Sequence, residues 1–276
     1  MTKEQGFAPI FILLLVLIIG VVYFFYSPKT KNIIQTVLPT PTPYQFPYKI
    51  PQVPNKRSYL TFLVGDSIVA ALGANDEGLR EDLLKNYPNH EFVNYNYGFP
   101  STNIESLPDR INSTTTNLGT SYQSINSQGF DLIIIESFAY NPLSQYPVAD
   151  GVKKQTEVLD QSVRELISTH PNAVIAIMTP IAPNKELFAK GTLDLSPTVR
   201  AQWVSERVAY IKNAIDFAQS HNIPLIDVYT KSLTPSGDGD LKYIDPHDYI
   251  HPSKTGIILI NQTIADFIFN NKIFPE

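Results

Sequence analysis

Two short, almost wholly apolar runs constrain the fold of this chain more than any other feature. They are residues 131–135 (DLIII) and 173–178 (AVIAIM), and each is followed by a longer stretch with helical spacing. Continuous apolar strands alternating with helices are typical of a parallel sheet that is buried on both faces. The pattern therefore predicts an α/β protein in which helices cover both sides of the sheet.

The same alternation extends through the C-terminal two-thirds of the chain. Further strands are predicted at 59–64, 90–94 and 223–228, and helices at 68–87, 104–111, 158–169, 198–220 and 255–270. No internal repeat and no second folding unit is visible. We expect one three-layer α/β/α domain that spans residues 58–276.

Reactive side chains follow several of these strands. Ser67 comes after the first strand, residues 98–103 after the second and Asn141 after the third, while Asp248 and His251 precede the last helix. In parallel sheets, ligands and reactive groups collect at the carboxyl ends of the strands. We expect these residues to converge at one edge of the sheet.

Ser67 ends the tripeptide Gly65-Asp66-Ser67, at the junction between a strand and a helix. A serine at this point is often only a helix N-cap. It can also be a nucleophile, because the free amides and positive potential of a helix start stabilise an attacking alkoxide. Gly65 would permit the tight turn, and Asp66 could fix the loop by hydrogen bonding.

Asp248 and His251 are three residues apart, close enough for the carboxylate to accept a hydrogen bond from one ring nitrogen within a tight turn. The other nitrogen would then face Ser67, which completes the parts of a nucleophilic hydrolase. Asp245 and His247 form a nearby pair of the same types. We prefer Asp248 and His251, because a helix opens directly behind that histidine.

These two motifs resemble the first and last blocks of the SGNH (GDSL-type) hydrolases, a likeness that covers about residues 58–274. The resemblance implies a flavodoxin-like fold and a catalytic triad of Ser67, His251 and Asp248. It also implies an oxyanion hole made by the Ser67 amide, a second backbone amide and an asparagine side chain.

The two middle blocks depart from the family pattern. The second block, usually Asn-x-Gly-x-x-Gly, here contains Asn96, Gly98 and Ser101, so that a serine replaces the last glycine. Either Gly98 or Ser101 could donate the amide, and Ser101 is preferred if its backbone tolerates a Cβ. The third block lacks its usual glycine and final acid. Asn141 is its candidate oxyanion donor, and an ordinary Asn-Pro turn is the alternative.

Glu136 ends an apolar strand at the same edge. It could order the loop or contact a substrate, or it could be a solvated strand end. His90, His170 and His221 lie in polar stretches between the predicted elements, and none has a carboxylate partner at the spacing of metal ligands. We expect no metal site and no cofactor.

Composition excludes several other classes of function. The net charge is −5 and no basic stripe is present, which gives no electrostatic case for nucleic acid. The absence of cysteine excludes disulfides, thiolate metal sites and a cysteine nucleophile.

The N-terminus carries twenty uncharged residues, 7–26, which as a helix would span a bilayer's apolar core. A cleaved signal peptide is the main alternative, although residues 27–30 offer no small-x-small cleavage site. We expect a single uncleaved anchor within residues 1–27. The lysine count across the span differs by one charge and does not fix its orientation.

Seven prolines punctuate residues 28–57, which read as an extended spacer between anchor and domain. An irregular arm packed on the domain through Tyr44, Phe46 and Tyr48 is the alternative. A spacer favours an extracytoplasmic domain at a membrane or cell envelope.

The function implied is hydrolysis of a carboxylic ester through an acyl-enzyme. Envelope polysaccharide O-acetyl groups and lipid esters are both compatible substrates. An O-acyltransferase with the same triad is one alternative. A non-catalytic binding module tethered to the membrane, which the altered third block would suit, is another.

Overall fold

The computed structural model describes residues 47–276. The predicted membrane span at 7–26 and the first part of the predicted spacer lie outside the described residues. Within residues 47–276, no helix combines the length and apolarity that crossing a bilayer requires.

Five parallel strands form the central sheet, in the order β2-β1-β5-β6-β7. Their bounds are β1 Ser58–Gly65, β2 Glu91–Gly98, β5 Leu132–Glu136, β6 Val174–Met178 and β7 Leu225–Ile226. Numbered among themselves, these strands run 2-1-3-4-5, the flavodoxin-like order. The predicted parallel α/β fold is therefore confirmed for the described part of the chain.

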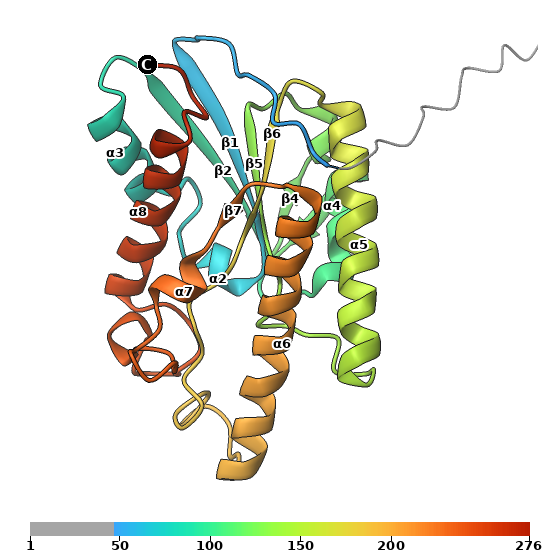
Figure 1. Ribbon diagram of the computed structural model, residues 1–276, viewed down its shortest axis with the longest axis vertical. Helices are drawn as coiled ribbons and strands as arrows, with labels where there is room; N and C mark the ends of the chain where they lie inside the picture. The colour runs from blue at the N-terminus through green and yellow to red at the C-terminus, as the bar shows by residue number, and fades with distance from the viewer. Residues whose placement is uncertain (1–46) are drawn as a thin grey trace, which may run out of the picture. The chain divides into compact units, whose positions relative to one another are not determined.

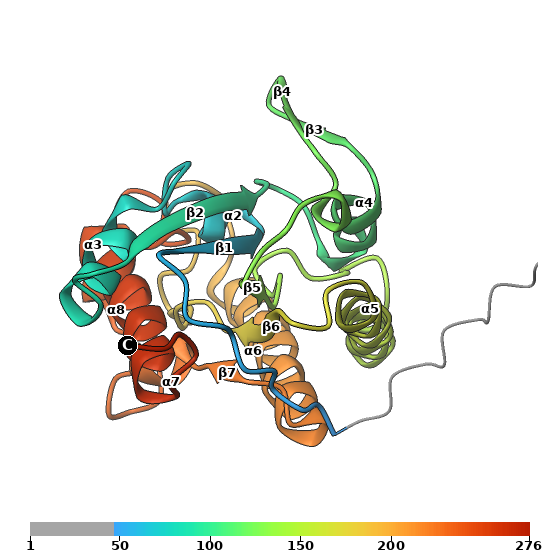
Figure 2. The ribbon, with the colours of Figure 1, turned by 90° about the horizontal axis from the view of Figure 1, so that it is seen from above.

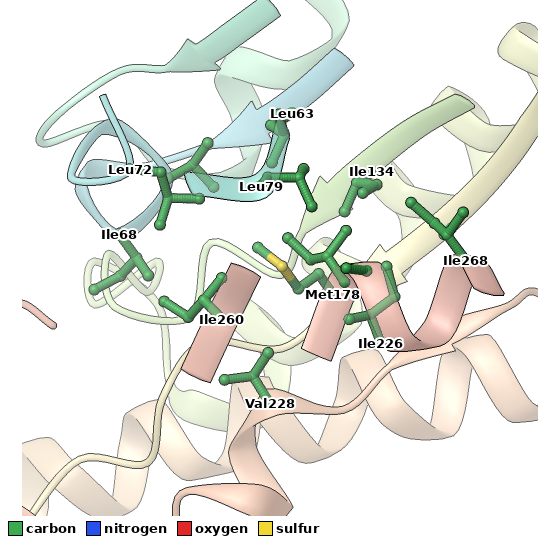
Figure 3. Packing of buried hydrophobic residues seen from close by; sticks show 14 of the residues in the cluster. Leu63, Ile68, Leu72, Leu79, Ile134, Met178, Ile226, Val228, Ile260 and Ile268 are labelled. Carbon is green, nitrogen blue, oxygen red and sulfur yellow. The ribbon is translucent and has the colours of Figure 1, made fainter. Parts of the chain in front are cut away.

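Helices cover both faces of this sheet (Figure 1). The helices α3 (Glu77–Asn86) and α8 (Lys254–Asn270) pack on one face, and α4 (Leu107–Asn112), α5 (Val148–Thr169) and α6 (Pro197–His221) on the other. Because successive side chains of a strand point to opposite faces of the sheet, each face has its own hydrophobic core. In β5, Ile134 faces the α3/α8 side and Ile133 and Ile135 the opposite side. Figure 3 shows the first core, where Leu63, Ile134 and Met178 from the sheet meet Ile260 and Ile268 from α8.

The predicted helix at 68–87 is instead two helices, α2 (Ser67–Ala70) and α3. Two residues between them, Gly73 (φ 89°) and Asp76 (φ 39°), have left-handed backbone conformations that a continuous helix cannot contain. The break shortens the helix that begins at Ser67 to one turn. The predicted helix at 158–169 begins earlier, at Val148.

A small hairpin, β3 (Thr115–Asn117) and β4 (Thr120–Tyr122), was not predicted. It projects from the edge of the domain beside α4 (Figure 2). Its base is held by Tyr122, whose ring packs 4.8 Å from that of Phe99.

Residues 47–57, which we expected in the spacer, pack on the domain as the alternative arm. Tyr48 and Val53 are buried, and the Tyr48 hydroxyl donates to Ala173 O (3.3 Å) and accepts from Ile175 N (3.1 Å). Further along, Lys56 forms an ion pair with Asp131, at the start of β5. The arm therefore crosses the amino-terminal ends of the strands (Figure 1).

Candidate active site

Three segments that carry predicted site residues follow neighbouring strands. Ser67 follows β1, which lies between β2 and β5 in the sheet, while Ser101 follows β2 and Asn141 follows β5. The strand order changes direction at the β1/β5 junction, because β2 lies on one side of it and β6 and β7 on the other. Doubly wound sheets bind their ligands at such a junction. Ser67 therefore lies at the position in the fold where a reactive group is expected.

The Gly65-Asp66-Ser67 turn is tightly packed. A Cβ on Gly65 would lie 2.4 Å from Val69 Cγ2 and 2.8 Å from Glu136 Cβ, so only glycine fits. Asp66 is the N-cap of α2, and its Oδ1 accepts from Ile68 N at 2.8 Å. Ser67 is therefore not the helix cap, the alternative considered from the sequence.

Ser67 is half-buried at the start of α2. Neither its hydroxyl nor its amide hydrogen-bonds to another of residues 47–276. Both groups are thus available to a ligand.

Asp248 and His251 form a hydrogen-bonded pair, with 2.6 Å between Asp248 Oδ2 and His251 Nδ1. The other oxygen, Oδ1, accepts from the amides of Ile250 (2.7 Å) and His251 (3.0 Å). Burial alone would raise the pKa of Asp248, but these hydrogen bonds to its ionised form lower it below its usual value. The carboxylate is therefore held ionised, in the form that orients an imidazole.

The neighbouring pair, Asp245 and His247, has a similar contact of 2.7 Å but a different environment. The His247 side chain is 91% exposed, whereas that of His251 is 37% exposed. Burial, the largest influence, raises the pKa of Asp66, the residue before Ser67, and a positive charge on His251 would lower it. Of the two pairs, Asp248 and His251 are the less exposed, and His251 makes no hydrogen bond to Ser67 Oγ.

Gly98 and Ser101 differ in what their amides do. Gly98 N donates to Asn96 Oδ1 at 2.7 Å, and a Cβ at Gly98 would lie 2.3 Å from Ala70 N. Ser101 has a φ of 59°, the left-handed conformation that favours glycine. Its amide donates to no acceptor within residues 47–276, and the residue is exposed. Ser101 thus keeps the backbone shape and the free amide of the glycine it replaces.

Asn141 lies in a turn in which its amide donates to Phe138 O at 3.1 Å. Its side chain reaches back to the nucleophile segment, where Nδ2 donates to Asp66 Oδ2 at 2.9 Å. An amide nitrogen has two hydrogens, so one remains for a further acceptor. This contact with Asp66 goes beyond an ordinary Asn-Pro turn.

Glu136 is completely buried, which rules out the solvated strand end considered from the sequence. It accepts from Ser137 Oγ (2.7 Å) and Phe138 N (2.8 Å), and so orders the loop after β5. Burial raises the pKa of both Glu136 and Asp66, and each carboxylate lies near the other.

Sequence reasoning missed Arg110, a buried side chain that hydrogen-bonds to the Gly-Asp-Ser turn and to the segment that holds Gly98 and Ser101. The available signal was its place in the predicted helix, three residues after Leu107 and next to Ile111, on the face that those apolar residues bury. Within residues 47–276, no cluster of three or more histidine or acidic side chains suited to a metal ion is found.

Comparison of the sequence with protein-family models gives no match, and none of the curated proteins matches it. Solved structures match over most of the chain. A lipase/acylhydrolase from Enterococcus faecalis has a TM-score of 0.54 at 19% identity, covering 77% of this chain and 96% of that one. A GDSL-like lipase from Parabacteroides merdae has a TM-score of 0.57 at 14% identity, covering 81% and 100%.

A catalytic mutant of an acetylxylan esterase from Geobacillus stearothermophilus also matches, with a TM-score of 0.52 at 17% identity over 76% of this chain and 94% of that one. At these identities the likeness establishes the fold. The resemblance seen in the sequence is thereby confirmed at that level, and the chain has the fold of the GDSL/SGNH hydrolases.

Proposed function

From this fold and the geometry of its carboxyl edge, we propose that the protein is a serine ester hydrolase. The observation that carries the proposal is the 2.6 Å contact between Asp248 and His251, in the loop that precedes α8. The unpaired hydroxyl of Ser67, at the start of α2, supports the same conclusion.

In the proposed mechanism, His251 Nε2 removes the Ser67 proton as the hydroxyl oxygen attacks the ester carbonyl carbon. Asp248 stabilises the imidazolium that forms. Collapse of the tetrahedral intermediate expels the alcohol, which takes the proton from His251. Water activated by His251 then attacks the acyl-serine and releases the acid.

The oxyanion is received by the amides of Ser67 and Ser101 and by the second Nδ2 hydrogen of Asn141. We favour Ser101 over Gly98, because the Gly98 amide already donates to Asn96. Loss of one such donor typically costs about 2.7–4 kcal/mol of transition-state stabilisation.

The proposed substrate is a carboxylic ester, either an O-acetyl group on a polysaccharide or a lipid ester. Structures with this fold include proteins described as lipases and as acetylxylan esterases, so both acyl classes belong to the proposal. Initial rates on p-nitrophenyl esters of increasing chain length separate them. A maximum at acetate supports the polysaccharide ester, and a maximum at eight or more carbons, on the order of a lipid chain, supports the lipid ester.

Labelling by a fluorophosphonate probe tests the nucleophile directly. We expect stoichiometric modification of Ser67 in the folded protein and none in Ser67→Ala. Labelling of neither protein would refute the enzyme proposal and leave the binding module, and equal labelling of both would refute the assignment of Ser67 as the nucleophile. Acetate release without any sugar acceptor distinguishes the hydrolase from an O-acyltransferase.

We further propose that residues 7–26 anchor the protein to a membrane, with the catalytic domain outside the cytoplasm. The support is the uncharged length of that segment and the proline-rich stretch that follows it. Recovery of the full chain in the membrane fraction, and protease access to the domain in intact cells, test the two parts separately.

A further inference from the structure

Arg110 is the largest fully buried side chain among residues 47–276, with 1% of its surface exposed. It comes from α4, which neither contains a predicted site residue nor directly follows a strand of the central sheet. A buried guanidinium is costly unless its donors and its charge are matched. Its partners therefore indicate why it is present.

The Nη1 atom of Arg110 bridges the carboxyl ends of β1 and β2. Nη1 donates to Gly65 O at 2.6 Å and to Tyr97 O at 2.7 Å. Gly65 is two residues before Ser67, and Tyr97 belongs to the strand that leads into the Ser101 loop. A single nitrogen thus ties the nucleophile segment to the second block.

The other end holds the loop that contains Ser101. Nη2 donates to Thr102 Oγ1, and to Ser106 Oγ at 2.8 Å. The Thr102 hydroxyl in turn donates to Phe99 O at 2.6 Å. The left-handed backbone of Ser101 is therefore fixed from both sides by residues that depend on Arg110.

Rings and charges complete the environment. The guanidinium carbon lies 4.1 Å from the centroid of the Phe99 ring and 5.2 Å from that of Phe138. Burial lowers the pKa of Arg110 to about 10, although the nearby Asp66 and Glu136 carboxylates raise it. Arg110 therefore remains charged at neutral pH.

We propose that Arg110 is a positioning residue that fixes the Ser101 amide relative to Ser67, so that two oxyanion donors point at one oxygen. This inference rests on the proposed ester hydrolysis. Arg110 does not touch the substrate, and it acts through the backbone of both segments. Lysine could not replace it, because an ammonium lacks the planar fork that reaches four acceptors on two sides.

The test compares Arg110→Lys with Arg200→Lys. Arg200 is also buried, and its guanidinium donates to three backbone carbonyls, Phe188 O (2.8 Å), Glu186 O (3.3 Å) and Leu195 O (3.1 Å). Both variants should unfold at lower urea concentration. Activity is therefore expressed per folded protein, from circular dichroism under the assay conditions.

For Arg110→Lys we expect kcat to fall about a hundredfold with KM unchanged, because misplaced donors weaken binding of the transition state alone. For Arg200→Lys we expect kcat within twofold of wild type, roughly the scatter of such comparisons. Equal kcat values for the two folded variants would overturn the proposal. A KM increase without a change in kcat in Arg110→Lys would also overturn it.

If Arg110→Lys does not fold, Thr102→Val carries the test, because it retains the guanidinium and removes one acceptor. A fall in kcat of about tenfold at constant KM supports the proposal, and an unchanged kcat overturns it. A wild-type protein with neither turnover nor fluorophosphonate labelling would instead refute the proposed function. The two failures are therefore distinguishable.

Discussion

Asn141 and Asp66 are joined by a hydrogen bond of 2.9 Å between the side-chain amide of one and the carboxylate of the other. The same carboxylate caps the single turn of helix that starts with Ser67. One acid therefore sets the direction of that helix and the orientation of an asparagine that lies 75 positions away in sequence.

This link predicts a specific effect of removing the asparagine side chain. Asn141→Ala should lower kcat about 10²–10³-fold with little change in KM, because it removes an oxyanion donor. Steady-state kinetics on p-nitrophenyl acetate measures both values. Asn126→Ala, which removes another partly buried amide whose nitrogen donates to Asn112 and Glu165, is the control and should leave kcat unchanged. A pure KM effect in Asn141→Ala would contradict the oxyanion role.

The two histidine–aspartate pairs provide a matched experiment. His251→Ala should lower kcat by roughly 10²–10⁴-fold, the usual contribution of a general base, while His247→Ala should leave it unchanged. The two histidines are four positions apart in the same loop, so a general disturbance of that loop would lower the activity of both variants. The result would contradict the assigned base if His247→Ala were the more damaging change.

The backbone conformation of Ser101 and the packing around Gly98 predict opposite tolerances to substitution. Ser101→Gly keeps the amide and relieves a left-handed serine, so it should retain kcat and change stability by less than about 1 kcal/mol. Gly98→Ala places a Cβ 2.3 Å from Ala70 N and should destabilise the fold by about 1–3 kcal/mol or more. Urea unfolding with parallel activity assays checks both. Loss of activity in Ser101→Gly would show that the serine side chain itself is required.

Asp76 predicts a dependence of stability on pH. Burial raises its pKa to about 7, opposed by hydrogen bonds from Leu79 N and Asn261. The folded state therefore keeps a proton that the unfolded state loses above about pH 4, so stability falls as pH rises from about 4 to 7 and levels off above. The loss is on the order of 4 kcal/mol at most.

Asp76→Asn should flatten this slope, measured by urea unfolding between pH 4.5 and 8 (roughly the window bounded by the two pKa values). Asp66 and Glu136, whose pKa values are also raised, leave a residual slope of the same sign. Asp150→Asn, a change at an exposed position of α5, serves as the control. A slope in Asp76→Asn as steep as that of wild type would disprove the assignment to Asp76.

The arm predicts where the folded unit begins. Tyr48 is 2% exposed, and its hydroxyl bonds to the backbone on both sides of Val174, so Tyr48→Ala should cost about 3–5 kcal/mol in unfolding free energy. Tyr146→Ala, at a 43% exposed position, should cost far less. A Tyr48→Ala chain as stable as Tyr146→Ala would mean that the arm contributes nothing to stability.

The elements predicted well from the sequence are those whose pattern is set by burial. The β5 and β6 strands were recognisable because a sheet covered on both faces requires apolar residues at every position. The Asp248–His251 contact was predictable because three residues suffice to close it. These features depend on local sequence.

The features that were missed depend on contacts far apart in the chain. The break before α3 follows from Gly73 and Asp76, within a stretch whose apolar spacing still looks helical. Arg110 was overlooked because arginine is rarely buried, and its carbonyl partners carry no side-chain signal. The packing of residues 47–57 on the domain was not predicted, because prolines mark irregular backbone equally in free and in packed segments.

The arm, residues 47–57, lies at the edge of the central sheet opposite the candidate site. Residues 47–57 pack against the starts of β5 and β6, whereas Ser67 follows the carboxyl end of β1. Because the strands are parallel, these two places lie at opposite edges of the central sheet. Contacts made at residues 47–57 would therefore leave the edge that holds Ser67 uncovered.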